Sequence, residues 1–247
     1  MKFDLTLPSD TAASVPRGVF ITGTDTGVGK TLVAAGLVRL LASHGKRVVG
    51  LKPVASGAEQ SAGGLRNDDA LALSAGSTVA LPYELTNPYC FAPAIAPHLA
   101  AREAGIAISV DALEDWYARA TTGVDVAVVE GAGGWRVPLH PEGFLSDLPE
   151  RLGLGVILVV GLRLGCLSHA RLTLEAIAAC GRCPFLGWIG NRIVPGFIRP
   201  EENLETLERL LGSPPLAVIP PLRVADPAAA VAWLDQPRLL RAVFPPQ

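Results

Sequence analysis

The sequence predicts a doubly wound α/β fold with a mostly parallel sheet in a single domain. Two observations lead to this prediction. Short apolar runs rich in β-branched residues recur without alternation, and segments with helical periodicity separate most of them. The chain has 247 residues, 49% hydrophobic and 18% charged, which allows one large core. Since no linker-like change of composition occurs, we expect a loose tail at 1–16 and one domain at 17–247.

The expected elements follow in the order that parallel strands require. A strand at 18–23, apolar on both faces, leads through glycines into a helix at 30–43. Parallel neighbours need crossover connections, so most later strands should follow a helix. The later strands are expected at 47–52, 124–130, 155–161, 185–191 and 216–220. The later helices are expected at 68–75, 110–121, 168–180 and 200–211.

One segment, 82–105, fits this alternation poorly. It carries four prolines and little periodicity, so we expect a long irregular insertion. A surface loop is the simplest interpretation. Its aromatic and imidazole side chains favour instead a segment that packs over something; they are Tyr83, Tyr89, Phe91 and His98.

Charge, cysteine content and hydropathy exclude several classes of protein. A net charge of −2 argues against a dedicated nucleic-acid binder. Cys180 and Cys183 form a C-x-x-C motif between a helix and a strand, which indicates a turn more than a redox pair or a zinc site. Residues 1–16 lack the apolar core of a signal peptide, and the longest apolar run, at 152–162, is too short to span a bilayer. We therefore expect a soluble cytoplasmic protein.

A glycine-rich turn, GTDTGVGKT, joins the first strand to the first helix. Gly27 and Gly29 leave backbone N–H groups open to phosphate, and the helix N-terminus adds a positive dipole end. Lys30 can reach the β- and γ-phosphates, and Thr31 offers a hydroxyl to Mg²⁺. The first glycine stands at Gly23, one residue earlier than in the common pattern, as in a distinct branch of P-loop proteins. The motif predicts nucleotide binding and does not by itself predict an enzyme.

Acidic residues near strand ends are the candidate Mg²⁺ ligands. The carboxyl ends of parallel strands meet at one edge of the sheet, so motifs that follow strands should converge there. Glu130 closes one strand directly before a run of glycines. Asp69 is a second candidate, although it could simply belong to the start of a helix. Asp25 and Asp147 are the alternatives.

Lys52 ends the second predicted strand and is one of only four lysines in the chain. A buried strand end rarely carries a charge unless that charge is paired. Beside a triphosphate, Lys52 would stabilise charge that develops during reaction. A lysine that extends its ammonium group from the strand end into solvent is the alternative.

Seven segments together resemble the dethiobiotin synthetase family. They are GTDTGVGKT, KPVASG, GLRNDDALAL, NPYCFAPAIAPH, VEGAGGWRVPL, VILVVGLRLGCLSHARLT and LGWIGN. The likeness extends from about Val19 to about Leu222, and the ordered set is far more specific than the P-loop alone. It implies a doubly wound P-loop NTPase-like α/β fold and a homodimer.

The resemblance implies ATP-dependent closure of a ureido ring in biotin biosynthesis. The diamine 7,8-diaminopelargonate takes up CO2 as a carbamate, and a carbamate oxygen attacks the γ-phosphate of ATP. The second amine then closes the ring, which gives dethiobiotin, ADP and phosphate. Mg²⁺ is the implied cofactor, and ATP and CO2 are substrates. Such phosphoryl transfer requires positioning and charge neutralisation rather than covalent catalysis by the protein.

The resemblance also implies roles for individual residues. The implied catalytic residues are Lys52, Lys30 and Thr26. The implied nucleotide-binding residues are Gly27, Val28, Gly29, Lys30, Thr31, Leu32, Asp69, Glu130, Gly131, Gly133, Asn191, Arg192, Pro220, Pro221 and Leu222. The implied substrate-binding residues are Thr26, Lys52, Ser56, Gly133, Arg163 and Ser168. The implied metal ligands are Thr31, Asp69 and Glu130.

Three positions depart from the usual family pattern. Arg192 follows Asn191, the implied adenine-reading amide, where an aspartate is common. Arg163 and Ser168 stand where lysine and asparagine often occur, in a region that commonly lies at the dimer interface near the substrate carboxylate. We therefore expect this chain to differ from other family members in its recognition of the adenine base and in its substrate affinity, and not in its chemistry.

Two other functions remain as alternatives. The same P-loop variant occurs in partitioning and septum-site ATPases, which act as switches on a protein partner or a surface. Those proteins usually carry a second lysine inside the loop, near Asp25 or Thr26, and often a patch for membrane or DNA. Here the loop has Asp25 and Thr26 instead, and no basic run follows. A ligase that amidates cobyrinate-type acids would normally bring a glutaminase domain, for which the chain has no room.

Overall fold

The computed structural model describes residues 18–244, so the tail expected at 1–16 lies outside the described residues. Within them, six parallel strands form the central sheet, at the positions expected from the sequence. They are β1 (Gly18–Gly23), β2 (Val48–Leu51), β7 (Val126–Glu130), β10 (Gly155–Gly161), β11 (Phe185–Asn191) and β12 (Ala217–Ile219). The spatial order is β12-β11-β10-β1-β7-β2, and every neighbouring pair is parallel. The predicted doubly wound α/β fold is confirmed.

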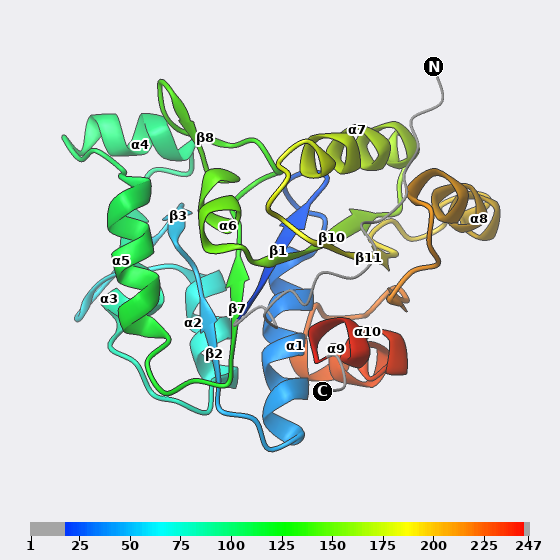
Figure 1. Cartoon of the computed structure of the whole chain (residues 1–247), viewed down its shortest axis with the longest axis horizontal. Coiled ribbons are helices and arrows are strands. Elements are labelled where there is room, and N and C mark those ends of the chain that lie inside the picture. The colour runs from blue at the N-terminus through cyan, green and yellow to red at the C-terminus, as the bar shows by residue number, and fades with distance from the viewer. Residues whose placement is uncertain (1–17, 245–247) are drawn as a thin grey trace.

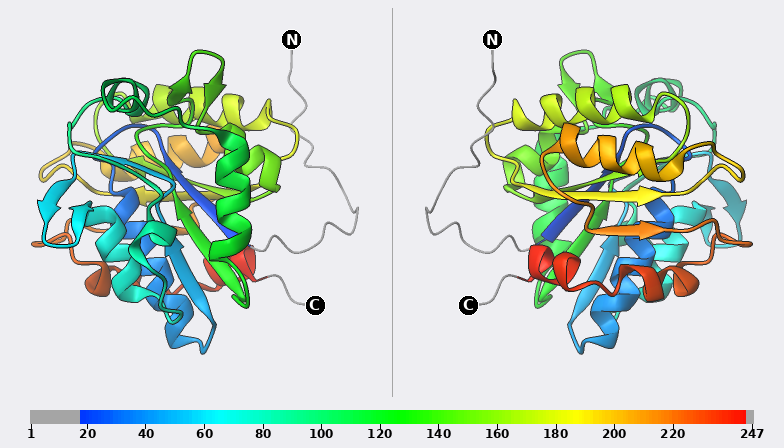
Figure 2. Two further views of the ribbon diagram at one scale, coloured as in Figure 1. Left: turned by 90° about the vertical axis from the view of Figure 1, so that its left-hand side faces the viewer. Right: turned by 90° about the vertical axis from the view of Figure 1, so that its right-hand side faces the viewer.

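Helices cover both faces of this sheet (Figure 1). One face is covered by α1 (Lys30–Ser43), α2 (Asp68–Gly76), α9 (Pro227–Leu234) and α10 (Pro237–Val243). The other face is covered by α5 (Val110–Ala120), α6 (Asp147–Leu152), α7 (Cys166–Ala178) and α8 (Pro200–Leu211). The right-hand view of Figure 2 shows β11 and β12 between α8 and α10. The five helices expected from periodicity are confirmed, although α7 begins two residues earlier than 168.

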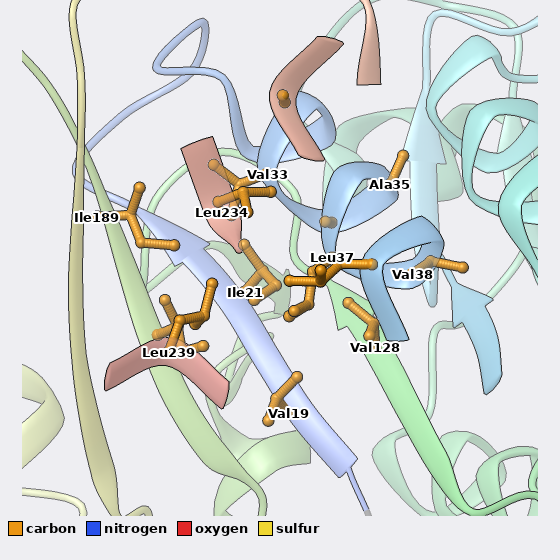
Figure 3. Close-up of a cluster of buried hydrophobic side chains, with 14 of the residues drawn as sticks. Val19, Ile21, Val33, Ala35, Leu37, Val38, Val128, Ile189, Leu234 and Leu239 are labelled. Carbon is orange, nitrogen blue, oxygen red and sulfur yellow. The ribbon is translucent and has the colours of Figure 1, made fainter. Parts of the chain in front are cut away.

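Helix α1 is the most deeply buried helix of its layer, because α9 covers the side that faces away from the sheet. Figure 3 shows Val33 and Leu37 of α1 beside Ile21 of β1 and Leu234 of α9. The two helices pack closely at Gly36, where an added Cβ would lie 2.7 Å from Leu234 Cδ1. The element that carries the glycine-rich loop is therefore held from two sides.

The 82–105 segment was expected to be irregular, but it contains regular secondary structure. It contains α3 (Tyr83–Thr86), β6 (Tyr89–Phe91) and α4 (Pro97–Glu103), and β6 pairs in parallel with β3 (Val54–Ser56). Elements this short carry too few residues to show a period, which explains the incorrect prediction. The expectation that the segment packs over other elements is confirmed, since α3 contacts both β2 and α5.

Two short hairpins complete the described part of the chain. They are β4 (Glu59–Ser61) with β5 (Gly64–Arg66), and β8 (Pro138–His140) with β9 (Gly143–Phe144). Across residues 18–244, no helix combines the length and apolar character needed to cross a bilayer.

Candidate active site

The loops that follow β1, β2 and β7 surround one pocket of about 790 Å³ at the carboxyl edge of the sheet. Its lining includes Thr26, Gly27, Gly29, Lys30, Thr31, Lys52, Ser56, Asp69, Glu130 and Gly133. The prediction that motifs at separate strand ends converge is confirmed for these residues. Cations, carboxylates, hydroxyls and glycine backbone thus meet in a space large enough for small-molecule substrates.

The loop from β1 to α1 has the backbone of a phosphate cradle. Gly27 and Gly29 have φ angles of 74° and 92°, a region that only glycine adopts without strain. Gly29 is also the N-cap of α1, so the free N–H groups of the first turn face the pocket side of the loop. A Cβ at Gly29 would lie 2.1 Å from Asn191 Nδ2, and Asn191 donates a hydrogen bond to Val28 O at 2.9 Å. The loop after β11 therefore helps to hold the cradle.

Lys30 is the first residue of α1, and its side chain reaches back to this loop. It is buried, and its Nζ donates to Asp25 O at 2.9 Å. Burial, together with repulsion from Lys52, lowers the pKa of Lys30 to about 8. A phosphate bound here would stabilise the ammonium form of Lys30 and so offset the cost of burying its charge.

A buried ion cluster lies at the back of the pocket. Lys52 Nζ donates to Asp69 Oδ2 at 2.7 Å and to Glu130 Oε1 at 2.8 Å, with Gly131 O at 3.4 Å. The Lys52 and Glu130 side chains are 4% and 1% exposed, whereas Asp69 is 38% exposed. Lys52 is therefore a paired lysine inside the pocket and does not extend from the strand end into solvent.

The pKa values in this cluster follow from burial and pairing. Burial raises the pKa of Glu130 above its usual range, although Lys52 opposes the shift. For Lys52, burial opposes the charge, but Glu130 and Asp69 outweigh it and the pKa is raised. For Asp69, burial is likewise outweighed, here by Lys52, and the pKa is lowered. In this cluster the Asp69 carboxylate therefore ionises more readily than usual, whereas the Glu130 carboxylate ionises less readily.

The arrangement around Thr31 fits a magnesium site. Thr31 Oγ1 lies 2.7 Å from Asp69 Oδ1 and 2.8 Å from Glu130 Oε1, but its one proton can be donated to only one of them. Glu130 Oε2 is buried and has no hydrogen-bond partner. No group of three or more His, Cys, Asp or Glu side chains suited to a metal occurs within residues 18–244. Two carboxylates and a hydroxyl suit Mg²⁺, which keeps waters and takes further oxygens from phosphate.

The two alternative metal ligands lie in other contacts. Asp25 forms an ion pair with Arg163, which comes from the loop between β10 and α7. The hydrogen bond that Thr26 N–H donates to Asp25 is the main reason why the pKa of Asp25 is lowered, and the ion pair with Arg163 adds to it. Asp147 accepts from Phe144 N at 2.8 Å at the start of α6.

Some expected site residues do not line this pocket. Arg163 binds Asp25 instead, and Ser168 is exposed on the first turn of α7. Gly131 is buried, and a Cβ there would lie 3.0 Å from the Phe20 ring, so it faces the core rather than a ligand. Val28 and Leu32 are also buried in the core. The side chain of Val28 faces the core, and its carbonyl accepts the hydrogen bond from Asn191.

A second, small pocket of about 90 Å³ lies on the side of Asn191. Arg192 and Pro221 line it, and the Arg192 guanidinium contacts both carboxylate oxygens of Glu201 at 2.8 Å. Pro220 is half-buried, and Leu222 packs against the hydrophobic core. Asn191 pairs with Ile219, directly before Pro220, and Arg192 N donates to Ile219 O at 3.0 Å, so the expected base-side residues lie close together, with Arg192 held by Glu201 of α8.

The sequence reasoning missed several residues at the main pocket. Arg136 lines it, and its guanidinium lies 5.4 Å from the centre of the Phe144 ring. Residues 94–97 of the insertion line it as well. Asn67 lies at the pocket wall and caps α2. The position of Arg136 directly after EGAGGW was the one signal that could have identified it.

The C-x-x-C motif is buried away from this chemistry. Cys180 and Cys183 form no disulfide. Burial raises the pKa of both thiols, that of Cys183 to about 12. Thiols that resist ionisation are poor nucleophiles, in agreement with the predicted structural turn.

Comparison with known proteins identifies the relatives of this chain. A family profile described as an AAA domain matches residues 17–229. An ATP-dependent dethiobiotin synthetase from Pseudomonas paraeruginosa is 52% identical over 87% of this chain and 95% of its own length. The enzyme of the same name from Chromohalobacter salexigens is 53% identical over 85% and 92% of the two chains.

Solved structures with the same fold are more distant. A ParA family ATPase from Chlorobium tepidum superposes with a TM-score of 0.55 at 14% identity, over 92% of this chain and 97% of that one. The MinD cell division protein of Aquifex aeolicus gives a TM-score of 0.53 at 16% identity, over 93% and 91% of the two chains. At this identity the likeness shows the fold alone.

Proposed function

The chain belongs to the ATP-dependent dethiobiotin synthetase family, and we propose on that premise that it forms dethiobiotin from 7,8-diaminopelargonate, CO2 and ATP. The observation that carries the proposal is the meeting of Lys30, Lys52 and the Thr31–Asp69–Glu130 group at one pocket. Family membership also decides against the switch ATPases, with which the chain shares a fold at low identity.

In this proposal the glycine-rich loop binds the phosphates of ATP through main-chain N–H groups, and Lys30 neutralises the β- and γ-phosphates. Asn191 and Pro221 are the proposed contacts for the adenine base of ATP. Lys52 lines the same pocket and shares the carboxylates of Asp69 and Glu130 with Thr31, so its ammonium group can stabilise charge on the transferring phosphoryl group. The protein supplies charge and position and forms no covalent bond to the substrate.

The bonds made and broken are those of a carbamate and a phosphoryl group. One amine of the diamine binds CO2 and loses a proton, which gives a carbamate. A carbamate oxygen attacks the γ-phosphorus, and ADP leaves. The second amine attacks the carbamoyl carbon and loses a proton, and phosphate leaves with the electron pair of the broken carbon–oxygen bond. Thr26, Ser56 and Gly133, all at the pocket wall, are the proposed contacts for the diamine and the carbamate.

Thr31, Asp69 and Glu130 are the proposed holders of Mg²⁺. Their fit rests on the unpartnered Glu130 Oε2 and on the single Thr31 proton between two carboxylates. A bound Mg²⁺ would neutralise phosphate charge. Lys52 contacts both carboxylates, so it holds them in place and opposes the rise that burial causes in the pKa of Glu130.

A homodimer and a cytoplasmic location are further parts of the proposal. Leu164, in the loop before α7, and Leu172, in the middle of α7, are 95% and 61% exposed, and in the proposed dimer the partner covers them. Arg163 and Ser168 lie in the same region and would contact the substrate carboxylate at such an interface. Light scattering coupled to size exclusion tests the dimer.

Phosphate release is the direct test of the function. With ATP present, release should require the diamine, bicarbonate and Mg²⁺ together, and dethiobiotin should appear by mass spectrometry. A switch ATPase would instead release phosphate without the diamine. Release that is indifferent to the diamine would remove the proposal.

A further inference from the structure

Residues of the 82–105 insertion hold the main chain of Lys52 on both sides. The N–H of Lys52 donates to Thr86 O at 2.8 Å. Its carbonyl accepts from Asn87 Nδ2 at 2.7 Å, and the same amide group donates to Tyr89 O at 3.1 Å. Asn87 is only 2% exposed. Both peptide groups of Lys52 are thus fixed from outside the central sheet.

The same insertion reaches the start of α2. The N–H of Asn67 donates to Tyr83 Oη at 2.7 Å. Asn67 is the N-cap of α2, and its side chain accepts from Ala70 N at 3.3 Å. Asp69 lies two residues beyond Asn67, in the first turn of the helix. Tyr83 therefore contacts the peptide group that leads directly to a carboxylate of the ion cluster.

Tyr83 and Asn87 connect these two contacts. Tyr83 Oη lies 3.1 Å from Asn87 Oδ1. Because the Asn87 amide nitrogen already donates to two carbonyls, Oδ1 must be the acceptor and Tyr83 the donor. Burial, with a contact to Cys90, raises the pKa of Tyr83 to about 12, so the phenol keeps the proton that it donates. One continuous chain of hydrogen bonds therefore runs from the N-cap of α2 to the carbonyl of Lys52.

We propose that Tyr83 and Asn87 are positioning residues that fix the ammonium group of Lys52 relative to the carboxylate of Asp69. This inference rests on the proposed function, since those two groups serve phosphoryl transfer and metal binding there. Neither Tyr83 nor Asn87 lines the pocket, so they act through the residues that they hold. A displacement of about 1 Å in such a site can lower a rate by about 100-fold, so the support has a direct kinetic consequence.

The test compares Tyr83→Phe with Tyr89→Phe. Tyr83→Phe keeps the ring, over which the Arg66 guanidinium lies at 4.0 Å, and removes only the hydroxyl that links Asn67 to Asn87. Tyr89→Phe is the matched control. It also removes a hydroxyl from the insertion. The Tyr89 hydroxyl accepts from Ser109 N at 3.4 Å and lies outside this chain of hydrogen bonds.

Tyr83→Phe is expected to lower kcat by about tenfold, the loss that corresponds to one hydrogen bond, while Kd for ADP without Mg²⁺ stays unchanged. The Mg²⁺ concentration that gives half of the metal-dependent gain in ADP affinity should rise by about tenfold, as for other residues that support a metal ligand. Tyr89→Phe should change neither value. Asn87→Ser, which removes the donor to Lys52, is a second variant and should lower kcat in the same way.

Two results would overturn the inference. One is a Tyr83→Phe protein with the kcat and Mg²⁺ requirement of the wild type. The other is an equal loss in both tyrosine variants that follows their melting temperatures, which would indicate general support of the fold. If the wild type releases no phosphate in response to the diamine, the proposed function fails, and the Mg²⁺ dependence of ADP binding alone still decides the role of Tyr83.

Discussion

Replacing Lys52 by methionine removes the cation of the buried cluster and keeps a side chain of similar length. The ammonium group lies 2.7 Å from Asp69 Oδ2 and 2.8 Å from Glu130 Oε1. At an effective dielectric constant of about 20, a pair at that distance attracts by about 6 kcal/mol. Desolvation of Lys52 and the 38% exposure of Asp69 offset much of this, so a net loss of about 3 kcal/mol in unfolding free energy is expected.

For a chain of this size, that loss should lower the melting temperature by about 6–12 °C. The deficit should shrink as the pH falls. Lys52 opposes the burial that raises the pKa of Glu130, so this pKa is higher still without Lys52. At low pH the neutral form of Glu130 therefore stabilises the variant more than the wild type, and this contribution is lost as the pH rises through the raised pKa. Calorimetry between pH 5 and pH 8 measures both effects. Added Mg²⁺ should restore more stability to Lys52→Met than to the wild type.

The catalytic effect should be larger than the effect on stability. Loss of one positioned charge at a transferring phosphoryl group is expected to lower kcat by about 10²–10³-fold. Kd for ADP should stay within about threefold, because the contacts of the glycine-rich loop remain. Coupled phosphate release and titration calorimetry measure the two values. A Lys52→Met protein with wild-type turnover would refute the catalytic role of the ammonium group.

Three further predictions concern the phosphate cradle and the metal. Nucleotide affinity should weaken as the pH rises through about 8, because Lys30 loses its charge there, and Lys30→Arg should flatten that dependence in a binding titration. Gly29→Ala should weaken ADP binding by at least about tenfold, because the backbone has φ of 92° and the new Cβ would meet Asn191; equal affinity in calorimetry would contradict this. Asp69→Asn should raise the half-saturating Mg²⁺ concentration by at least about tenfold with little change in metal-free ADP binding.

Much of the fold could be predicted because its signals are local. The six buried strands are continuous apolar runs, and the five long helices carry enough residues to show a period. The glycine-rich turn fixed the start of α1 and the place of the pocket, since a strand, a turn and a helix in that order leave one geometry for phosphate. Lys52 and Glu130 could be assigned to the same edge because each stands at a strand end.

The remainder depends on contacts between distant segments. The contact between Tyr83 and the N-cap of α2, two residues before Asp69, joins segments that are 16 residues apart, and no sequence pattern predicts it. The short elements of 82–105 have no detectable period. Arg163 matches a substrate-binding position by motif, and this stays a prediction. Its ion pair with Asp25 spans 138 residues, and one sequence gives no signal for such a pair.

The position of β2 at the margin of the sheet has a consequence for how this enzyme can be altered. Strand β2 has a sheet neighbour on one side only, β7, and outer strands are usually the first to loosen. The residue after it, Lys52, nevertheless carries the ammonium group proposed to act in catalysis. Shortening the 82–105 segment would therefore release the cation while the central sheet remained intact, so loss of turnover would precede loss of folding. Designs that aim for a smaller catalyst should therefore leave residues 82–105 whole.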